Sequence, residues 1–271
     1  MPELPEVETI ARGLARRIIG RTVERVRIGL PKMAVAPEDL VFAKALVGER
    51  IERIGRRGKY VVMELQSGRG LVTSLRMTGR LIVQRDRALA PHPYTHVALD
   101  LNDGSRLCFA DSRQFGRMRL VGPGERWDAA LGTEPLSLDF TPEAFIGMLC
   151  GRPTPIKVFL LDQRRIAGIG NIYACEALWE ARIRPDRPAK SLGKPAIRRL
   201  HPAIVGVLQR AIRLRGTTVD DYVDAEGLRG GFQNKLAVYG RNGKPCKRCG
   251  RKVVRTVLAQ RGTWWCRGCQ K

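Results

Sequence analysis

The first twenty residues place apolar side chains with the period of an amphipathic helix. The apolar positions follow i, i+3, i+4 spacing and are Val7, Ile10, Ala11, Leu14, Ala15 and Ile18. Pro5 suits the first turn of such a helix, where its missing N–H costs nothing, and Gly20 suits its end. The pattern therefore predicts a helix that fixes the amino terminus against a core. On this pattern alone, Pro2 and Glu3 are only the lead-in to a capped helix.

From about Val23 to Val121 the pattern changes to that of short strands. The apolar and β-branched runs, each bounded by turn residues, are KYVVMEL, GLVTSL, GRLIVQ, HVALDL and RLCFA. Asn102-Asp103-Gly104 lies between the last two runs and is a hairpin signal. Many short strands after a single helix predict a first domain built as a sandwich or a barrel.

Turn residues accumulate between Gly122 and Pro142, and helical periodicity follows them. The predicted helical runs are PEAFIGMLC, PIKVFLLDQ, NIYACEALWEARI and the stretch Pro195–Arg215. A tight glycine turn, GIGN, separates the second and third of these helices. Residues 216–231 contain glycine and aspartate and are predicted to form an exposed, mobile loop.

Composition narrows the partners of this chain. Its 271 residues suffice for two domains with an appendage, and its net charge is +23 with a pI near 10.7. Such a charge favours a polyanionic partner, either nucleic acid or an anionic membrane surface. No apolar run approaches the length of a membrane span, and Arg12, Arg16 and Arg17 interrupt the first apolar stretch, which excludes a signal peptide. Nucleic acid is therefore favoured.

The carboxyl end contains two CxxC pairs with sixteen residues between them. Cys246, Cys249, Cys266 and Cys269 have the spacing of a tetrahedral four-cysteine zinc site, with a hairpin holding the pairs together. The alternative, two disulfides, conflicts with the missing secretion signal. Four protein ligands leave no open position, so we expect one structural Zn²⁺. The remaining cysteines, expected as buried thiols in a reducing cytosol, are Cys108, Cys150 and Cys175.

The same segment is strongly cationic. Residues 241–271 contain ten Lys or Arg residues and no Asp or Glu, a composition suited to phosphate contacts. The glycine turn at Gly168–Asn171 places backbone N–H groups at a helix N-terminus, which also favours a phosphate. Glycine turns between helices are common, so this turn alone is weak evidence for a phosphate site. The basic finger strengthens that interpretation.

Seven separated motifs in one order resemble the family of bacterial formamidopyrimidine-DNA glycosylases. They are PELPEVET, RRGKY, LRMTG, DSRQFG, GIGNIYA, VYGRNGKPC and the four-cysteine finger. The resemblance implies an α+β fold: an N-terminal β-sandwich with a leading helix over 1–130, a helix–two-turn–helix domain over 131–225, and the lesion-loop end with the zinc-finger hairpin over 226–271. It also implies excision of oxidised purines such as 8-oxoguanine and formamidopyrimidines, followed by strand cleavage through β,δ-elimination.

The resemblance gives the amino terminus a chemical role. Once Met1 is removed, Pro2 has a free secondary amine that can attack the sugar C1′ and form an iminium ion. An α-amino group with a pKa of ~8 is about a tenth neutral at pH 7, against roughly 0.04% for a lysine. By the same resemblance, Glu3 handles protons at the sugar and Glu6 is a second carboxylate, although a helix-dipole role for Glu6 is an equal alternative.

Further residues are assigned by the same resemblance. Lys59 transfers a proton in β-elimination, and Arg261 assists δ-elimination and contacts phosphate. Because the target base leaves the stack, a wedge of Met77, Arg113 and Phe115 fills the gap. The remaining expected DNA contacts are Lys157 near the damaged base and Asn171 and Tyr239 at phosphates. The loop after Gly216 closes over the extruded lesion.

Two positions depart from the family pattern. Ser74 stands where a histidine usually precedes the wedge strand, and Pro93-Tyr94-Thr95-His96 replaces a Lys-His-x-His sequence. Ser74 and Tyr94 can still donate hydrogen bonds to DNA. His96 as a retained contact competes with a structural role.

The expected partner is double-stranded DNA that carries oxidised bases or abasic sites. We expect a monomer, no membrane association, and a bacterial cytoplasmic protein that reaches the nucleoid through DNA. Two alternatives are an endonuclease VIII-like enzyme for oxidised pyrimidines and a non-catalytic zinc-ribbon DNA-binding protein. The PELPEVE opening and the Met-Arg-Phe wedge argue against the first, and the second needs no free Pro2 amine.

Overall fold

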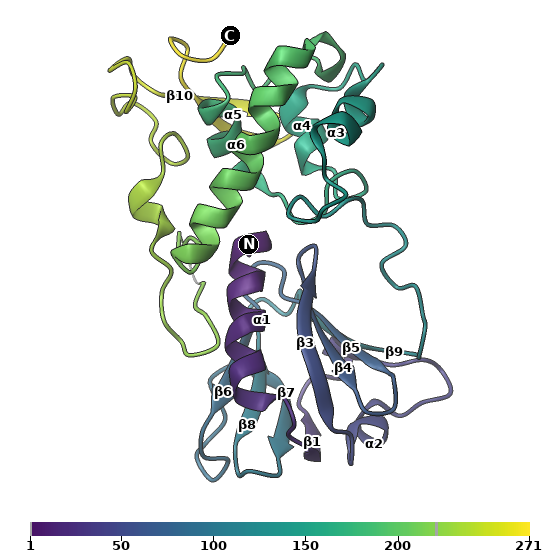
Figure 1. Cartoon of the computed structure of the whole chain (residues 1–271). Coiled ribbons are helices and arrows are strands. Elements are labelled where there is room, and N and C mark those ends of the chain that lie inside the picture. Colours follow the sequence, from purple (N-terminus) through teal and green to yellow (C-terminus); the bar gives the residue numbers. More distant parts are fainter. Residues whose placement is uncertain (1, 220–221) are drawn as a thin grey trace. The chain divides into compact units, whose positions relative to one another are not determined.

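The computed structural model describes residues 2–219 and 222–271, which form two compact units (Figure 1). The first unit combines Met1–Ala129 with Leu214–Gly231, and the second combines Ala130–Arg213 with Phe232–Lys271. The three-part division expected from the sequence stays a prediction. In the structure, residues 214–231 pack with the first unit and the cysteine-rich end packs with the second.

The first unit is a two-sheet β-sandwich with a leading helix, as expected. Its helical elements are α1 (Leu4–Ile18), a 3₁₀ turn (Pro31–Met33) and α2 (Phe42–Leu46). Its strands are β1 (Val23–Ile28), β2 (Ala34–Val35), β3 (Ile51–Arg57), β4 (Tyr60–Leu65), β5 (Gly70–Ser74), β6 (Arg80–Gln84), β7 (Thr95–Leu101), β8 (Arg106–Ala110) and β9 (Arg117–Val121). One sheet has the order β1-β7-β8-β6, and the other has the order β2-β9-β5-β4-β3. All five sequence-predicted strand runs are confirmed.

Helix α1 closes one side of the sandwich. It packs against β3 and β6, which are edge strands of different sheets, and against β4 (Figure 1). Its apolar stripe, from Val7 to Ile18, joins the main hydrophobic core together with strand side chains such as Phe109. Because α1 covers both edge strands, it shields their unpaired backbone N–H and C=O groups from solvent. The same contacts fix the position of α1, which begins at Leu4.

Residues 216–219 and 222–231 are only partly the exposed loop that the sequence predicts: Val219 and Leu228 are exposed, but other side chains are not. Thr217, Asp224 and Ala225 are buried, and Ala225 belongs to the core cluster beneath α1. Gly13 of α1 accommodates this contact, because a Cβ there would lie 3.0 Å from Cβ of Ala225. The polar composition of the loop predicted exposure, but packing against α1 overrides it. Residues 220–221, part of the same predicted loop, lie outside the described residues.

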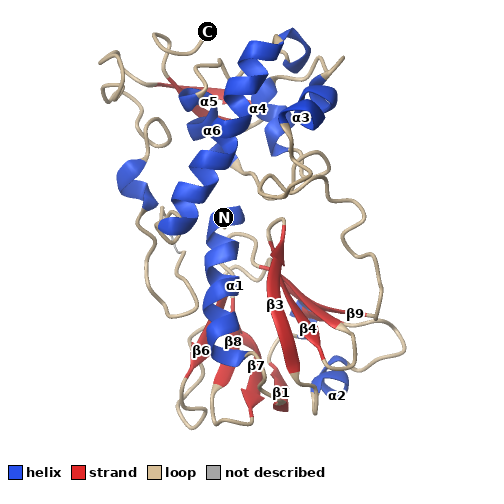
Figure 2. Cartoon of the chain, in the orientation of Figure 1, coloured by secondary structure: helices blue, strands red, loops and turns tan. Residues whose placement is uncertain are grey.

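The second unit is helical with one β-hairpin (Figure 2). Its helices are α3 (Pro142–Leu149), α4 (Ile156–Leu161), α5 (Asn171–Glu180) and α6 (Lys194–Arg213), with 3₁₀ turns at Ala189–Ser191 and Phe232–Lys235. The hairpin consists of β10 (Val254–Leu258) and β11 (Arg261–Trp265) and lies between the two cysteine pairs, as predicted. The predicted helices are confirmed within a few residues at each end.

One cysteine assignment is wrong. Cys108 and Cys175 are buried as expected, but Cys150 is exposed. Cys150 caps the end of α3 and precedes Gly151, whose φ of +69° turns the chain away from the helix. Its apolar neighbours in sequence face the core, whereas the cap position faces solvent.

Candidate functional site

The amino terminus is held by a reciprocal capping arrangement at the start of α1. Glu3 is the N-cap residue, and Oε2 of Glu6 accepts the Glu3 N–H at 2.8 Å while the Glu3 side chain accepts the backbone N–H of Glu6. Both carboxyl groups are almost fully buried, and Pro2 is buried directly before them. Pro2 and Glu3 are therefore more than the lead-in to a helix: together with Glu6 they form a compact, buried group of one imino acid and two carboxylates.

Glu6 links this group to the 214–231 segment. Its second oxygen, Oε1, accepts the backbone N–H of Thr217 at 2.7 Å. Tyr222 donates to the carbonyl of Arg215 at 3.1 Å and lies 3.4 Å from the carbonyl of Glu6, and burial together with the Glu6 charge raises the pKa of its phenol. Glu6 thus contacts both the amino-terminal residues and the start of the expected lesion loop, which a role at the helix dipole alone does not require.

Gly216 makes that contact possible. Its φ is +79°, and an added Cβ would lie 2.7 Å from Oε1 of Glu6. We expect Gly216→Ala to lower the free energy of unfolding by about 2–4 kcal/mol, since a left-handed conformation and a clash add. Gly227→Ala is the matched control, because its φ is +78° and nothing lies within 4 Å of the added Cβ. That variant should lose only about 1 kcal/mol in the same denaturant titration. Equal losses would contradict the Glu6 contact.

Lys59 lies in the β3–β4 turn, which is attached to α1. Arg56 donates from Nε to Glu8 of α1 at 3.0 Å and from Nη1 to the carbonyl of Gly58 at 2.9 Å. Gly58 has a φ of +55°, which forms the turn, and Lys59 is half-buried. Arg56, which the sequence reasoning did not single out, therefore joins the Lys59 turn to the helix that carries Glu3 and Glu6.

The three expected wedge residues come from two turns of the first unit. Met77 lies in the turn between β5 and β6 and is 40% exposed, and Phe115 lies between β8 and β9 and is 52% exposed. The guanidinium of Arg113 lies 5.0 Å from the centre of the Phe115 ring, a cation–π contact. Side chains this exposed are not part of a hydrophobic core, so Met77 and Phe115 are available for contacts outside the fold.

The positions that depart from the family pattern lie near these turns in the sequence and differ in exposure. Tyr94 is 66% exposed with a φ of +62°, so its phenol is accessible. Ser74 is half-buried, and its hydroxyl lies 3.5 Å from the carbonyl of Arg117. His96 is also half-buried, with Nε2 3.0 Å from the carbonyl of Asp111, which favours the structural role for this histidine. His92 lies in the adjoining loop with Nδ1 2.9 Å from the Pro93 carbonyl.

In the second unit, the start of α5 is bound to the β10–β11 hairpin. Asn171 follows the N-cap Gly170 and donates from Nδ2 to the carbonyl of Gly262 at 3.0 Å. Within residues 2–219 and 222–271, its Oδ1 is buried without a hydrogen-bond partner. Arg261 begins β11 next to Gly262 and is exposed. These contacts hold the backbone beside Arg261 in place.

Lys157 does not have the accessible position expected of a DNA contact. Its side chain is fully buried in α4, and Nζ donates to the carbonyl of Gly262 at 3.0 Å and to Oγ1 of Thr263 at 2.7 Å. A buried ammonium needs such partners, because desolvation without them is costly. In this arrangement Lys157 supports the hairpin beside Arg261, and the structure does not favour its expected contact with a damaged base.

Tyr239 is half-buried on the segment that leads into the cysteine cluster. Its ring lies 4.4 Å from that of Trp264, and its backbone N–H donates to Oε1 of Glu176 at 2.8 Å. Glu176 of α5 also accepts the N–H groups of Ala237 and Val238 at 2.8 and 2.9 Å. The sequence reasoning missed Glu176, although a lone acid within the apolar run NIYACEALW was an available signal.

The four expected zinc ligands converge. The Sγ atoms of Cys246, Cys249, Cys266 and Cys269 lie within 4.8 Å of one another. A tetrahedral site with Zn–S bonds of ~2.3 Å needs sulfur atoms about 3.8 Å apart. The separations of 3.9 Å for Cys246–Cys269 and 3.5 Å for Cys249–Cys266 fit this geometry. Burial opposes ionisation of Cys246, but N–H groups of Arg248 and Trp179 lower its thiol pKa to about 6.

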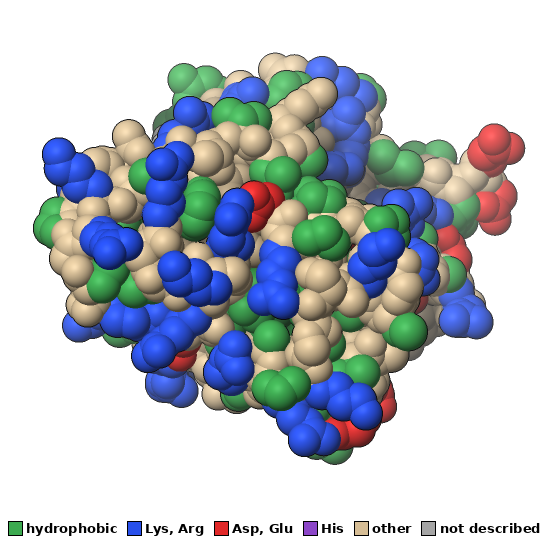
Figure 3. Space-filling model, turned by 90° about the horizontal axis from the view of Figure 1, so that it is seen from above, with side chains coloured by type: hydrophobic (Ala, Val, Ile, Leu, Met, Phe, Trp, Pro, Cys, Tyr) green, Lys and Arg blue, Asp and Glu red, His purple; other side chains and the backbone are tan. Residues whose placement is uncertain are grey.

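Lys and Arg side chains are spread over the face drawn in Figure 3, and far fewer Asp and Glu side chains lie among them. This distribution agrees with the net charge of +23 and favours an anionic partner. No helix within residues 2–219 and 222–271 combines the length and apolar composition needed to span a membrane.

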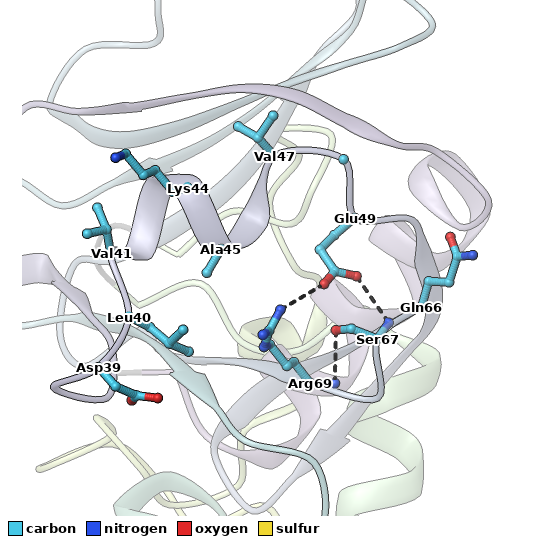
Figure 4. A pocket seen from close by; sticks show the side chains of 11 residues that line it. Asp39, Leu40, Val41, Lys44, Ala45, Val47, Glu49, Gln66, Ser67 and Arg69 are labelled. Atoms are coloured by element: carbon cyan, nitrogen blue, oxygen red, sulfur yellow. Dashed lines mark hydrogen bonds and ion pairs between the residues drawn. The ribbon is translucent and has the colours of Figure 1, made fainter.

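A separate hollow of about 860 Å³ lies beside α2 and the β4–β5 turn (Figure 4). Glu49 accepts from Nη1 of Arg69 at 3.3 Å and from the N–H of Ser67 at 3.1 Å along its wall. None of the site residues predicted from the sequence lines this hollow. Its Glu49 and Arg69 are paired with each other, and the hollow contains none of the groups assigned above, so we do not take it as the candidate site.

Three family models match the chain along its length. They are the formamidopyrimidine-DNA glycosylase N-terminal domain over residues 1–118, the H2TH domain of the same enzyme over 131–223, and a zinc finger found in FPG and IleRS over 243–271. A formamidopyrimidine-DNA glycosylase from Heliobacterium modesticaldum is 49% identical over 280 residues and covers 100% of both chains.

Two solved structures extend the comparison to DNA complexes. The complex between the Lactococcus lactis FPG and a FAPY-dG containing DNA matches with a TM-score of 0.90 and 34% identity, covering 99% of this chain and 100% of that chain. The complex between the Lactococcus lactis Fpg and an abasic site containing DNA matches with a TM-score of 0.91 and 34% identity, covering 99% of both chains.

Proposed function

This chain belongs to the formamidopyrimidine-DNA glycosylase family, and we propose that Pro2 is its nucleophile. The protein is a DNA glycosylase for oxidised purines that acts on double-stranded DNA and carries one structural zinc. As in its relatives, we assign it a second, lyase activity that cleaves the strand at the resulting abasic site. We place its action on chromosomal DNA at the nucleoid.

The first step forms one bond and breaks another. After removal of Met1, the neutral amine of Pro2 attacks C1′ of the damaged nucleotide, and the C1′–N9 bond breaks. The base leaves with the electron pair and takes up one proton, while the Pro2 nitrogen, now bonded to C1′, loses its N–H proton. Glu3 then delivers a proton to the sugar ring oxygen as the ring opens, leaving an iminium ion between Pro2 and C1′.

The iminium ion makes strand cleavage possible because it accepts electrons. Removal of a C2′ proton shifts an electron pair toward the iminium nitrogen and breaks the C3′–O3′ bond, which is the β-elimination assigned to Lys59. In the second, δ-elimination, removal of the C4′ proton supplies the electron pair of a new double bond, the C5′–O5′ bond breaks, and Arg261 stabilises the departing phosphate. Water finally hydrolyses the iminium and releases Pro2. The structural zinc takes no part, because all four of its ligands are protein thiolates.

DNA contacts are assigned to residues of both the sandwich and the helical unit. We propose that Met77, Arg113 and Phe115 fill the space left by the extruded base, with Arg113 hydrogen-bonding the unpaired partner base. Tyr94, Asn171, Tyr239 and Ser74 are the proposed phosphate or backbone contacts, and the exposed Tyr94 has the freest access among them.

The observation that supports this proposal best is the position of Glu6. One carboxylate binds the N–H of Glu3 at 2.8 Å and the N–H of Thr217 at 2.7 Å. The nucleophile's neighbour and the segment assigned to lesion closure are therefore fixed by the same buried group. A DNA-binding protein without catalytic chemistry has no need for this connection.

Borohydride trapping on a panel of duplexes tests the proposed function. Each oligonucleotide carries one lesion, either 8-oxoguanine, a formamidopyrimidine, an oxidised pyrimidine or an abasic site, and is scored for excision, strand cleavage and covalent adduct. We expect adducts with every excised lesion, and excision of purine lesions before pyrimidine ones. Preferential excision of pyrimidines would favour the endonuclease VIII-like alternative. Binding without any adduct would leave only the zinc-ribbon alternative.

A further inference from the structure

We propose that Asp111 is a positioning residue that fixes the Met77 turn and the Arg113–Phe115 turn as one rigid unit. This inference rests on the proposed wedge function of those side chains. Asp111 follows β8 directly and is 1% exposed, so it cannot contact DNA itself. Its effect must pass through the turns to which it is bonded.

Both carboxylate oxygens of Asp111 are used. Oδ1 accepts from the hydroxyl of Thr78, which is the neighbour of Met77, and from the backbone N–H of Arg113 at 3.1 Å. Oδ2 accepts the backbone N–H of Gly116 at 2.7 Å. One side chain therefore holds donors from each of the two turns that carry the wedge.

The main chain of Asp111 adds a third attachment. Its N–H donates to the carbonyl of Tyr94 at 3.0 Å, and its carbonyl accepts the N–H of Gln114 at 3.2 Å. Nε2 of His96 lies 3.0 Å from the same carbonyl. Asp111 thus also fixes the end of the segment that carries the exposed Tyr94.

The backbone of both turns requires such support. Arg76 and Gln114 have φ values of +54° and +57°, which are unfavourable for residues with a side chain. The chain passes so closely at Gly116 that no larger residue fits. An added Cβ there would lie 2.9 Å from the carbonyl oxygen of Ser74 and 3.1 Å from Oδ2 of Asp111. A strained backbone conformation persists only when surrounding interactions hold it, and Asp111 supplies several of the hydrogen bonds that do so.

The network requires an ionised carboxylate. Burial would raise the pKa of Asp111, but the Thr78 hydroxyl and the N–H groups of Gly116, Arg113 and Phe115 lower it below its usual value. A carboxylate has acceptors on both oxygens, whereas an amide must turn an NH₂ group toward one of these donors. Asp111→Asn therefore breaks part of the network with little change in volume.

Fixing the wedge residues in place should increase the rate of the reaction on duplex DNA only. Extruding a stacked base leaves a gap that the wedge must fill at once, and ordering two loose turns at that moment would cost entropy. An abasic site in single-stranded DNA has no base to extrude and no gap to fill. A positioning role at the wedge therefore separates these two substrates, whereas a general loss of structure would not.

The test measures Asp111→Asn on both substrates. We expect kcat/KM for 8-oxoguanine excision from a duplex to fall about 10- to 100-fold, the scale of a misplacement near 1 Å. Cleavage at an abasic site in single-stranded DNA should stay within about 2-fold of the unmodified protein, since Pro2, Glu3 and Lys59 are untouched. The fluorescence rise of 2-aminopurine placed next to the lesion, which reports unstacking, should become slower.

Asp103→Asn is the matched control. Asp103 lies in the turn before β8, accepts the N–H of Ser105 at 3.0 Å and its hydroxyl at 2.6 Å, and is bonded to neither wedge turn. We expect this variant to match the unmodified protein on both substrates. Thr78→Val removes one donor to Asp111, so its loss should be smaller and should not add to that of Asp111→Asn.

Two results would overturn the inference. One is duplex excision by Asp111→Asn at the rate of the Asp103→Asn control. The other is an equal loss on duplex and single-stranded substrates. The variants Met77→Ala and Phe115→Ala distinguish a wrong role for Asp111 from a wrong assignment of the wedge. If both leave duplex excision unchanged, the proposed wedge is wrong and the inference falls with it. If they slow excision and Asp111→Asn does not, only the inference fails.

Discussion

Pro2→Gly is expected to abolish borohydride trapping and to lower base excision by at least ~10²-fold. Glycine retains a terminal amine, but it lacks the ring that makes the nucleophile a secondary amine and limits its rotation before the Glu3 cap. DNA affinity should change little, because the phosphate contacts come from other residues. Trapping yield, excision rate and equilibrium binding to a duplex with an abasic-site analogue, measured on one preparation, give the three quantities.

Pro5→Ala is the control for this variant. Pro5 lies in the first turn of α1, so the substitution alters the same helix start without touching the terminal amine. We expect it to trap as the unmodified protein does. Mass spectrometry of the reduced adduct should locate the linkage at Pro2. An adduct mapped to Lys59, or equal excision by Pro2→Gly, would show that the nucleophile is assigned wrongly.

Removal of zinc is expected to lower DNA affinity by about 10²-fold, the effect of losing two or three charge-assisted phosphate contacts. The cysteine pairs fix both ends of the β10–β11 hairpin, and that hairpin carries Arg261 and packs on Tyr239 through Trp264. Without the metal, no bond holds the four sulfur atoms together, and the two ends of the hairpin are no longer fixed to each other. Binding before and after chelation, followed by restoration with Zn²⁺ alone, measures the effect.

Cys249→Ser should reproduce the chelated state, and Cys150→Ser should not, because Cys150 is exposed and lies outside the cluster. The sandwich should keep its cooperative unfolding transition in each case, since its core is formed by other residues. Unchanged affinity after complete removal of zinc would contradict the role given to the hairpin.

Periodicity, turn signals and spacing were enough for the elements of the fold. The i, i+3, i+4 stripe after Pro5 predicted α1, which is confirmed, and the short runs before Val121 predicted a sandwich or a barrel, of which the structure has the sandwich. The CxxC spacing predicted the zinc ligands, and the four sulfurs lie together. These features are local, because a helix face, a hairpin or a CxxC turn is fixed by residues close in the chain.

The amino acid sequence alone thus determined the order of the elements, the zinc ligands and the basic character of this protein. Only the tertiary structure decided that Glu6 bonds to Thr217, that Lys157 is buried under the hairpin, and that Ala225 packs beneath α1. It also brought Asp111 between two turns more than thirty residues apart. Such pairings depend on which surfaces meet after folding, and a residue's type and spacing do not encode its distant partner.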